Sequence, residues 1–149
     1  MTNETPDAKV RADIKKHGWH CLNVWPMVGE DRTAFSYTIG LAESYGHPEI
    51  AVFGLGDKAH GILRDCANLV STGTRFVEDQ PNNDVLSGDY KVIFKSVRKD
   101  RFNEYFGTAL RYYGSQPFDA FVLFWPNKQH EFPWEAPEPG MQAEALHVV

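Results

Sequence analysis

Cysteine is scarce in this sequence: 149 residues contain only two, Cys21 and Cys66. Neither has a second cysteine nearby with which it could form a metal-binding knuckle or a redox pair. Both lie among apolar residues, and an apolar environment raises the pKa of a thiol and makes it unreactive. We therefore expect two reduced, largely buried thiols.

Long hydrophobic runs are also missing. No stretch approaches the ~20 consecutive apolar residues that a membrane-spanning helix needs. Residues 1–7 lack the basic region and following apolar stretch of a secretory signal. These absences predict a cytoplasmic protein that does not bind a membrane.

Basic clusters are absent as well. The chain has 15 basic and 20 acidic residues, a formal net charge of −5, and no Lys/Arg cluster longer than Lys15-Lys16 or Arg98-Lys99. Neutralising nucleic-acid phosphates or an anionic membrane requires a concentrated basic face. We therefore expect no nucleic-acid partner, whereas an acidic surface suits a basic protein partner.

Aromatic residues, by contrast, are plentiful at 13% of the chain. They supply core volume, and some offer flat, partly polar surfaces that suit a ligand. The length of 149 residues is close to the commonest size of one domain. We expect a frayed N-terminus at residues 1–6, one domain at 7–135, and a Pro/Glu-rich tail at 136–149.

Hydrophobic periodicity predicts the secondary structure. Strands are expected at residues 19–27, 34–41, 49–55, 75–77 (short), 90–97 and 118–125. Helices are expected at residues 7–18, 57–73 and 100–114, and each of these spans ends at a glycine. The acidic stretch 78–89 is long for a structureless connection.

Consecutive strands joined by short turns favour antiparallel pairing. The predicted fold class is therefore α+β, with a strongly curved, mostly antiparallel sheet and about three helices.

The strand at residues 34–41 alternates cleanly. One face carries Phe35, Tyr37, Ile39 and Leu41, and the other carries Ala34, Ser36, Thr38 and Gly40. The second face is small and rich in hydroxyl groups, so a strand, a helix or a ligand can lie close against it.

Several short motifs become recognisable together. They are Gly18-Trp19-His20, residues 35–41, Gly46-His47-Pro48-Glu49, residues 52–55, Trp125-Pro126 and Phe132-Pro133-Trp134-Glu135. In combination they resemble the bacterial domain of unknown function 4262 family, from about the first helix to Trp134. Members often carry an acidic residue after the Trp-Pro pair, where this chain has Asn127. The resemblance implies no activity.

A second resemblance concerns the fold alone. The order of strands and helices is similar to that of flavin-binding split-barrel proteins, which would imply a flavin cofactor. The sequence contains no motif for a flavin phosphate.

The first functional hypothesis is a small-molecule or cofactor-binding domain, and a flavin-like ligand is its most specific version. The pocket would lie between the hydroxyl-rich face, the turn at residues 47–49 and the aromatic loop at residues 125–134. Its candidate residues are Ser36, Tyr37, Thr38, Gly40, His47, Glu49, Trp125, His130 and Trp134.

The turn that holds His47 beside Glu49 has two interpretations. The pair could orient a polar ligand or take up a proton, or it could satisfy backbone groups of the turn and of the strand end. Similarly, the Gly54-Leu55-Gly56-Asp57 turn resembles a phosphate-binding loop but lacks the spacing of the known motifs.

Two alternatives belong to other classes of protein. An interaction module of the immunity or antitoxin type would present Glu78, Asp79 and Asp84 to a basic partner, and a homodimer is compatible with the sequence. A metal-dependent or hydrolytic enzyme would use His20 and His47, although His17 and His20 need not converge across Gly18. We expect no metal site and assign no catalytic residue.

Overall fold

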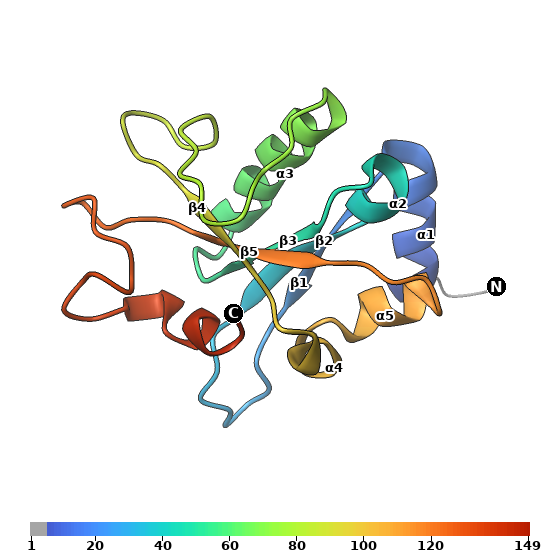
Figure 1. Ribbon diagram of the computed structural model, residues 1–149. Helices are drawn as coiled ribbons and strands as arrows, with labels where there is room; N and C mark the ends of the chain where they lie inside the picture. Colours follow the sequence, from blue (N-terminus) through green and yellow to red (C-terminus); the bar gives the residue numbers. More distant parts are fainter. Residues whose placement is uncertain (1–5) are drawn as a thin grey trace.

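The computed structural model describes residues 6–149, so the predicted frayed N-terminus lies outside the described residues except for Pro6, where α1 begins. A five-stranded sheet forms the centre of the fold (Figure 1). Its strands are β1 (His20–Val24), β2 (Phe35–Ile39), β3 (Glu49–Phe53), β4 (Ile93–Ser96) and β5 (Ala120–Phe124).

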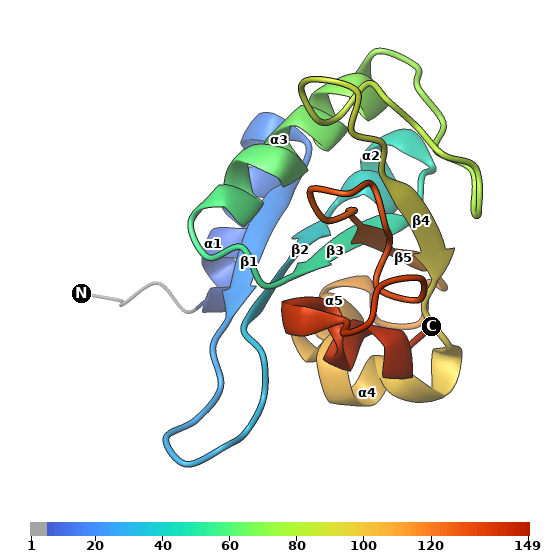
Figure 2. The same ribbon diagram turned by 90° about the vertical axis from the view of Figure 1, so that its left-hand side faces the viewer.

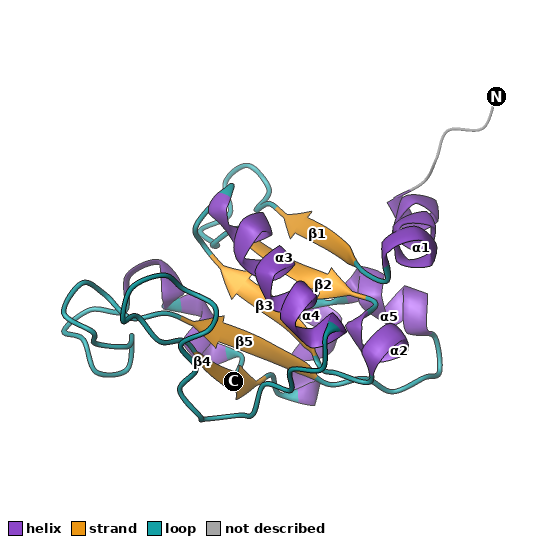
Figure 3. Cartoon of the chain, turned by 90° about the horizontal axis from the view of Figure 1, so that it is seen from above, coloured by secondary structure: helices purple, strands orange, loops and turns teal. Residues whose placement is uncertain are grey.

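The sheet is open and mixed, and its strand order is β1-β2-β3-β5-β4. Three of its four pairings are antiparallel, whereas β3 and β5 run parallel. Figure 3 shows β1 and β4 at opposite edges of this sheet. The predicted α+β class is confirmed, but the predicted strong curvature is wrong, because the sheet neither closes nor curls into a split barrel.

The helices are more numerous and shorter than predicted. Five α-helices occur within residues 6–149: α1 (Pro6–His17), α2 (Leu41–Tyr45), α3 (Lys58–Ser71), α4 (Phe102–Tyr105) and α5 (Gly107–Tyr113). Three short 3-10 helices accompany them: η1 (Lys99–Arg101), η2 (Gly140–Gln142) and η3 (Glu144–His147). The predicted helix at 100–114 breaks at Phe106, whose φ of −118° and ψ of 38° are not helical.

Helices cover both faces of the sheet (Figure 1). Helix α3 packs on one face, where Leu63, Cys66 and Ala67 contact a cluster that includes Ile50 and Val52. Helices α1, α4 and α5 cover the other face. The predicted alternation is confirmed for Phe35, Tyr37 and Ile39, which all lie in this second cluster. Leu41 was expected on the same face, but it begins α2 and packs in the cluster under α3, because the strand ends at Ile39. All five β2 residues are buried, so α3 is what lies against the hydroxyl-rich face.

The C-terminal residues fold onto the domain instead of forming the expected tail. Ala145 and Val148 are buried in the same core as α4 and α5. The Gln142 side chain exchanges two hydrogen bonds with the backbone of Trp125, at 3.1 and 2.8 Å. The tail prediction is therefore wrong, because a few apolar residues such as Ala145 and Val148 anchor a segment that is otherwise rich in Pro and Glu.

The connection from α3 to β4 contains no strand at residues 75–77, contrary to expectation. Phe76 is nevertheless buried against Phe94. The acidic stretch 78–89 is held beside β4 by a bridge between Asn82 and Val92 and by the backbone N–H of Asp79, which donates to the carbonyl oxygen of Phe94 at 2.9 Å. Within residues 6–149, no helix has both the length and the apolar character required to cross a membrane.

Candidate functional site

Glu49 is the centre of a buried polar cluster. Its carboxylate accepts hydrogen bonds from five donors: the hydroxyls of Thr38 and Tyr113 and the backbone amides of Gly40, Leu41 and Ala42. The bonds from Thr38 and the three amides measure 2.7 to 3.2 Å. Those amides begin helix α2, whose first N–H groups have no partner within the helix. Glu49 therefore acts as the N-terminal cap of α2.

This cluster is buried and tightly packed, so it leaves no room for a ligand. Burial raises the pKa of the Glu49 carboxyl, although the surrounding donors favour its ionised form. Gly40 has a φ of 118°, and a Cβ atom there would lie 2.7 Å from the carbonyl oxygen of Gly18. Three of the predicted site residues, Thr38, Gly40 and Glu49, thus meet as expected, but they meet in a packed interior.

His47 is also committed to the interior. Its Nε2 accepts the backbone N–H of Phe76 at 3.1 Å, which leaves Nδ1 as the donor to the carbonyl oxygen of Pro48 at 2.8 Å. The ring lies edge-on to Phe76 and Phe121. Burial lowers the pKa of His47, so the neutral ring is favoured. Both ring nitrogens are occupied, and the geometry fits the backbone-satisfying interpretation.

The remaining candidates are distributed over separate places. Tyr37 is buried, and burial raises its pKa to about 12. His130 stacks on Tyr90 with ring centroids 4.5 Å apart. Trp134 stacks on Phe132, and the Nζ of Lys95 lies 4.7 Å from its ring centroid. The backbone of Trp125 forms hydrogen bonds with the Gln142 side chain of the C-terminal segment. The nine predicted residues therefore do not line one common pocket.

A different cavity lies where strands end. Strands β1, β3 and β5 run in the same direction, so their carboxyl ends lie at the same end of the sheet. In α/β sheets, ligands bind outside such carboxyl ends. A cavity of about 100 Å³ lies there, lined by Asn23, Trp25, Ala34, Phe35, Ser36, Gly54, Gly56, Asp57 and His60.

The polar groups of this cavity are only partly used by the protein. The Ser36 hydroxyl donates to Oδ1 of Asn23 at 2.6 Å, which leaves the Asn23 amide hydrogens and the Ser36 lone pairs for other partners. Asp57 stands at the N-cap position of α3 but makes no side-chain cap hydrogen bond. Among residues 6–149 its carboxylate has neither a hydrogen bond nor an ion pair.

A second hollow is lined by residues of α1, β1 and α3. Figure 2 shows these three elements next to one another. The volume of the hollow is about 480 Å³, and its lining residues are Asp13, His17, Trp19, His20, Cys21, His60, Arg64 and Asn68. Nδ1 of His20 lies 2.7 Å from a carboxylate oxygen of Asp13. The part of the chain that the structure describes contains no group of three His, Cys, Asp or Glu residues that could hold a metal ion. His20 and His47, the proposed metal ligands, belong to separate sites.

Sequence reasoning missed Asn23, Trp25 and His60. A signal was present, because Trp19, Cys21, Asn23 and Trp25 alternate at period two, and Asp57, His60, Arg64 and Asn68 follow helical spacing. Each series therefore shares one face of its element. Only the fold reveals that the two series border the same hollows.

Comparison with known proteins gives one match. A family model described as "Domain of unknown function (DUF4262)" matches residues 13–138. No curated protein and no solved structure matches the chain.

Proposed function

The chain belongs to the DUF4262 family, whose function is unknown, and we therefore propose a function from its own geometry. We propose that the protein binds a small hydroxylated or amine-bearing ligand in the cavity at the carboxyl ends of β1 and β3. The proposal keeps the small-molecule hypothesis of the sequence analysis but places the ligand in a different pocket, lined by the residues around this cavity. The proposal includes no flavin, because the open sheet removes the split-barrel analogy.

One observation carries the proposal: the exposed Asp57 carboxylate lines a cavity and has no partner among residues 6–149. Together with the lone pairs of Ser36, it presents acceptors, which fit a ligand that supplies O–H or N–H donors. The amide hydrogens of Asn23 add one donor group to the same wall.

Trp25 and the β3–α3 turn support the same conclusion. The Trp25 side chain is 65% exposed at the cavity, so the flat face of a sugar or an ammonium group can pack on its ring. In the turn, Leu55 has a φ of 69° between the positive φ angles of Gly54 and Gly56. Such backbone strain in a non-glycine residue concentrates at ligand sites.

Intrinsic fluorescence provides the first test. We would titrate the protein with choline, ethanolamine and glucose, and follow tryptophan emission. We expect a saturable change for one of these compounds, and Trp25→Phe should remove the change in emission without removing the binding that calorimetry detects. Native mass spectrometry of gently purified protein would show whether a compound of this class is retained.

A matched pair of variants tests the role of Asp57. Asp57→Asn should weaken binding at least about tenfold, since one charge-assisted hydrogen bond contributes roughly 1.5–3 kcal/mol. Asp119→Asn is the control, because Asp119 is exposed and pairs with Lys99 at the amino end of β5, away from the carboxyl ends of the strands. Equal affinities in both variants, or no saturable response to any of the three compounds, would contradict the proposal.

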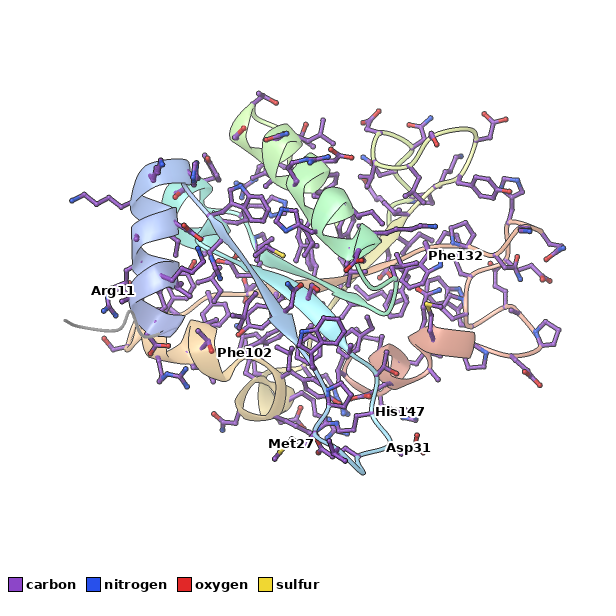
Figure 4. The ribbon with its side chains drawn as sticks, turned by 180° about the vertical axis from the view of Figure 1, so that it is seen from behind. Arg11, Met27, Asp31, Phe102, Phe132 and His147 are labelled. Carbon is purple, nitrogen blue, oxygen red and sulfur yellow. The ribbon has the colours of Figure 1, made fainter. Side chains whose placement is uncertain are left out.

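A protein-interaction module is the second candidate, and the β1–β2 loop favours it. Residues 25–34 project from the body of the molecule (Figure 2), and Figure 4 shows Met27 and Asp31 at the outer end of this loop. The Met27 side chain is 76% exposed and Val28 is fully exposed. Exposed apolar side chains at a projecting tip are typical of contact surfaces.

The acidic loop is less suited to that role than the sequence indicated. Asp79 pairs with Lys95 at 2.7 Å, and Glu78 accepts the backbone N–H of Ser96. A pull-down with Met27→Ser/Val28→Ser therefore tests the interaction hypothesis more directly than charge reversal at these two residues. Unchanged partner capture by that double variant would count against the tip.

A further inference from the structure

The second hollow, lined by residues of α1, β1 and α3, has an unusual composition for an acidic protein. The chain has a net charge of −5 and six histidines, yet three of those histidines and an arginine line this one hollow. They come from three elements: His17 from α1, His20 from β1, and His60 and Arg64 from α3.

We propose that this hollow binds a tetrahedral oxyanion, namely the phosphate or sulfate group of a ligand or the free ion. The site is distinct from the cavity proposed above and does not rest on that proposal. His60 lines both hollows, so it separates the two binding places.

Donor groups from three elements line the hollow. His60, Arg64 and Asn68 are four residues apart on α3 and therefore lie on one face of that helix. Asp13 orients the His20 ring by binding Nδ1, and Nε2 of His20 has no protein partner among the described residues. Within residues 6–149, Arg64 pairs only with its neighbour Asp65, at 3.8 Å, and its side chain is 59% exposed.

The groups that oppose an anion are few. Among the described residues, Asp13 is the only carboxylate in the lining, and it is paired with His20 and, at 3.9 Å, with Lys9. The exposed carboxylate of Asp65 lies outside the lining, 3.8 Å from Arg64. The hydrogen bond from His20 holds the pKa of Asp13 below its usual value, so its charge stays constant above acidic pH. Burial raises the pKa of Cys21 to about 11, which keeps that thiol neutral. Trp19 and Asn68 are uncharged.

Anion affinity at such a site depends on pH. Histidine side chains change their charge between pH 5 and 8. Three histidine side chains line this hollow. A doubly charged anion should therefore bind more tightly at pH 6.0 than at pH 7.5.

The test uses sulfate, which stays doubly charged at both pH values. Side-chain NMR signals of the histidines would be followed during a sodium sulfate titration of the full chain at constant ionic strength, because salt screens exposed charges. We expect saturable shifts at His17, His20 and His60, with an affinity at least about tenfold higher at pH 6.0. Shifts that stay linear, or that are equal at all six histidines, would overturn the proposal.

Matched variants separate site binding from general charge effects. Arg64→Gln and His60→Gln should each weaken sulfate binding at least about fivefold, because a charge-assisted hydrogen bond is lost. Arg98→Gln and His147→Gln are the controls, since both residues are exposed and lie outside the lining of the hollow; Arg98 follows β4 and donates to the carbonyl oxygen of His147. Both test residues are exposed on α3, so circular dichroism should confirm an intact fold. Equal affinity in the test and control variants would overturn the proposal.

Two further titrations distinguish the sources of the oxyanion. Tighter binding of glycerol phosphate than of inorganic phosphate would support a phosphate ester as the ligand. Equal binding would support the free ion. Failure of both compounds and of sulfate would overturn the site, whereas the Trp25 titration would be unaffected.

Discussion

Two carboxylates in this protein, those of Glu49 and Asp57, lie in opposite environments. Glu49 is fully buried and accepts five hydrogen bonds. Asp57 occupies a capping position without capping and lines a cavity. At the residue scale, the first carboxylate stabilises the fold and the second remains available to a ligand.

Glu49→Ala is expected to lower the free energy of unfolding by at least about 3 kcal/mol, because each buried donor left without a partner costs about 1–3 kcal/mol. Glu43→Ala is the matched control: Glu43 also accepts a tyrosine hydroxyl, that of Tyr112 at 2.8 Å, but at the surface. Its loss should stay below about 1 kcal/mol. Urea denaturation measures both values, and equal losses would contradict the capping role.

At the scale of elements, local patterns predicted most strands and the helix α3 well. The period-two alternation appears over residues 35–39 of the predicted strand 34–41, and the three-four spacing after Asp57 appears where expected. Helix α2 was missed because its five residues carry no periodic signal, and its cap, Glu49, follows it in the sequence. The break at Phe106 was missed because the apolar stripe continues through it.

The C-terminal segment yields a prediction at the same scale. Val148 is buried, and its carbonyl oxygen accepts the backbone N–H of Arg98 at 2.8 Å. Val148→Asp should destabilise the fold by at least about 2 kcal/mol, since it buries an unpaired charge. Val149→Asp, at a half-buried neighbour, should cost clearly less. Thermal melting followed by circular dichroism compares both variants with the original chain, and an unchanged midpoint in Val148→Asp would contradict the anchoring role of this residue.

At the scale of the whole molecule, stability should depend on His47. The folded state disfavours its protonation, so its contribution is present above the ordinary histidine pKa of about 6.5 and is lost as the pH falls below it. Burial of Glu49 acts in the opposite direction, because a raised carboxyl pKa makes the folded state retain a proton above the ordinary value of 4.5.

A variant isolates the histidine contribution from the rest. Between pH 7.5 and 5.5, the free energy of unfolding of His47→Gln should fall less steeply than that of the original chain. Urea denaturation at three pH values measures the two slopes. Parallel slopes would show that His47 is not the group responsible.

The site was less predictable than the fold for a geometric reason. Sequence reasoning correctly associated Thr38, Gly40 and Glu49, which are close in the chain, but it could not see that α2 and Tyr113 close around them. It also left open whether His17 and His20 converge. His17 and His20 line the same hollow, and His60 and Arg64 of α3 line it too. No local sequence pattern predicts that α3 packs beside β1.

The strand order has a consequence for how the chain reaches this structure. Strand β5 is the last strand in the sequence, yet it lies inside the sheet and is the ladder partner of both β3 and β4. Strands β1, β2 and β3 are consecutive in the sequence and can pair through short connections. Strand β4 pairs only with β5, so it has no ladder partner until β5 takes its place in the sheet. Such non-local pairing slows folding relative to a helical bundle of equal length. Refolding should therefore be limited by the insertion of β5, the step that joins the two halves of the sheet.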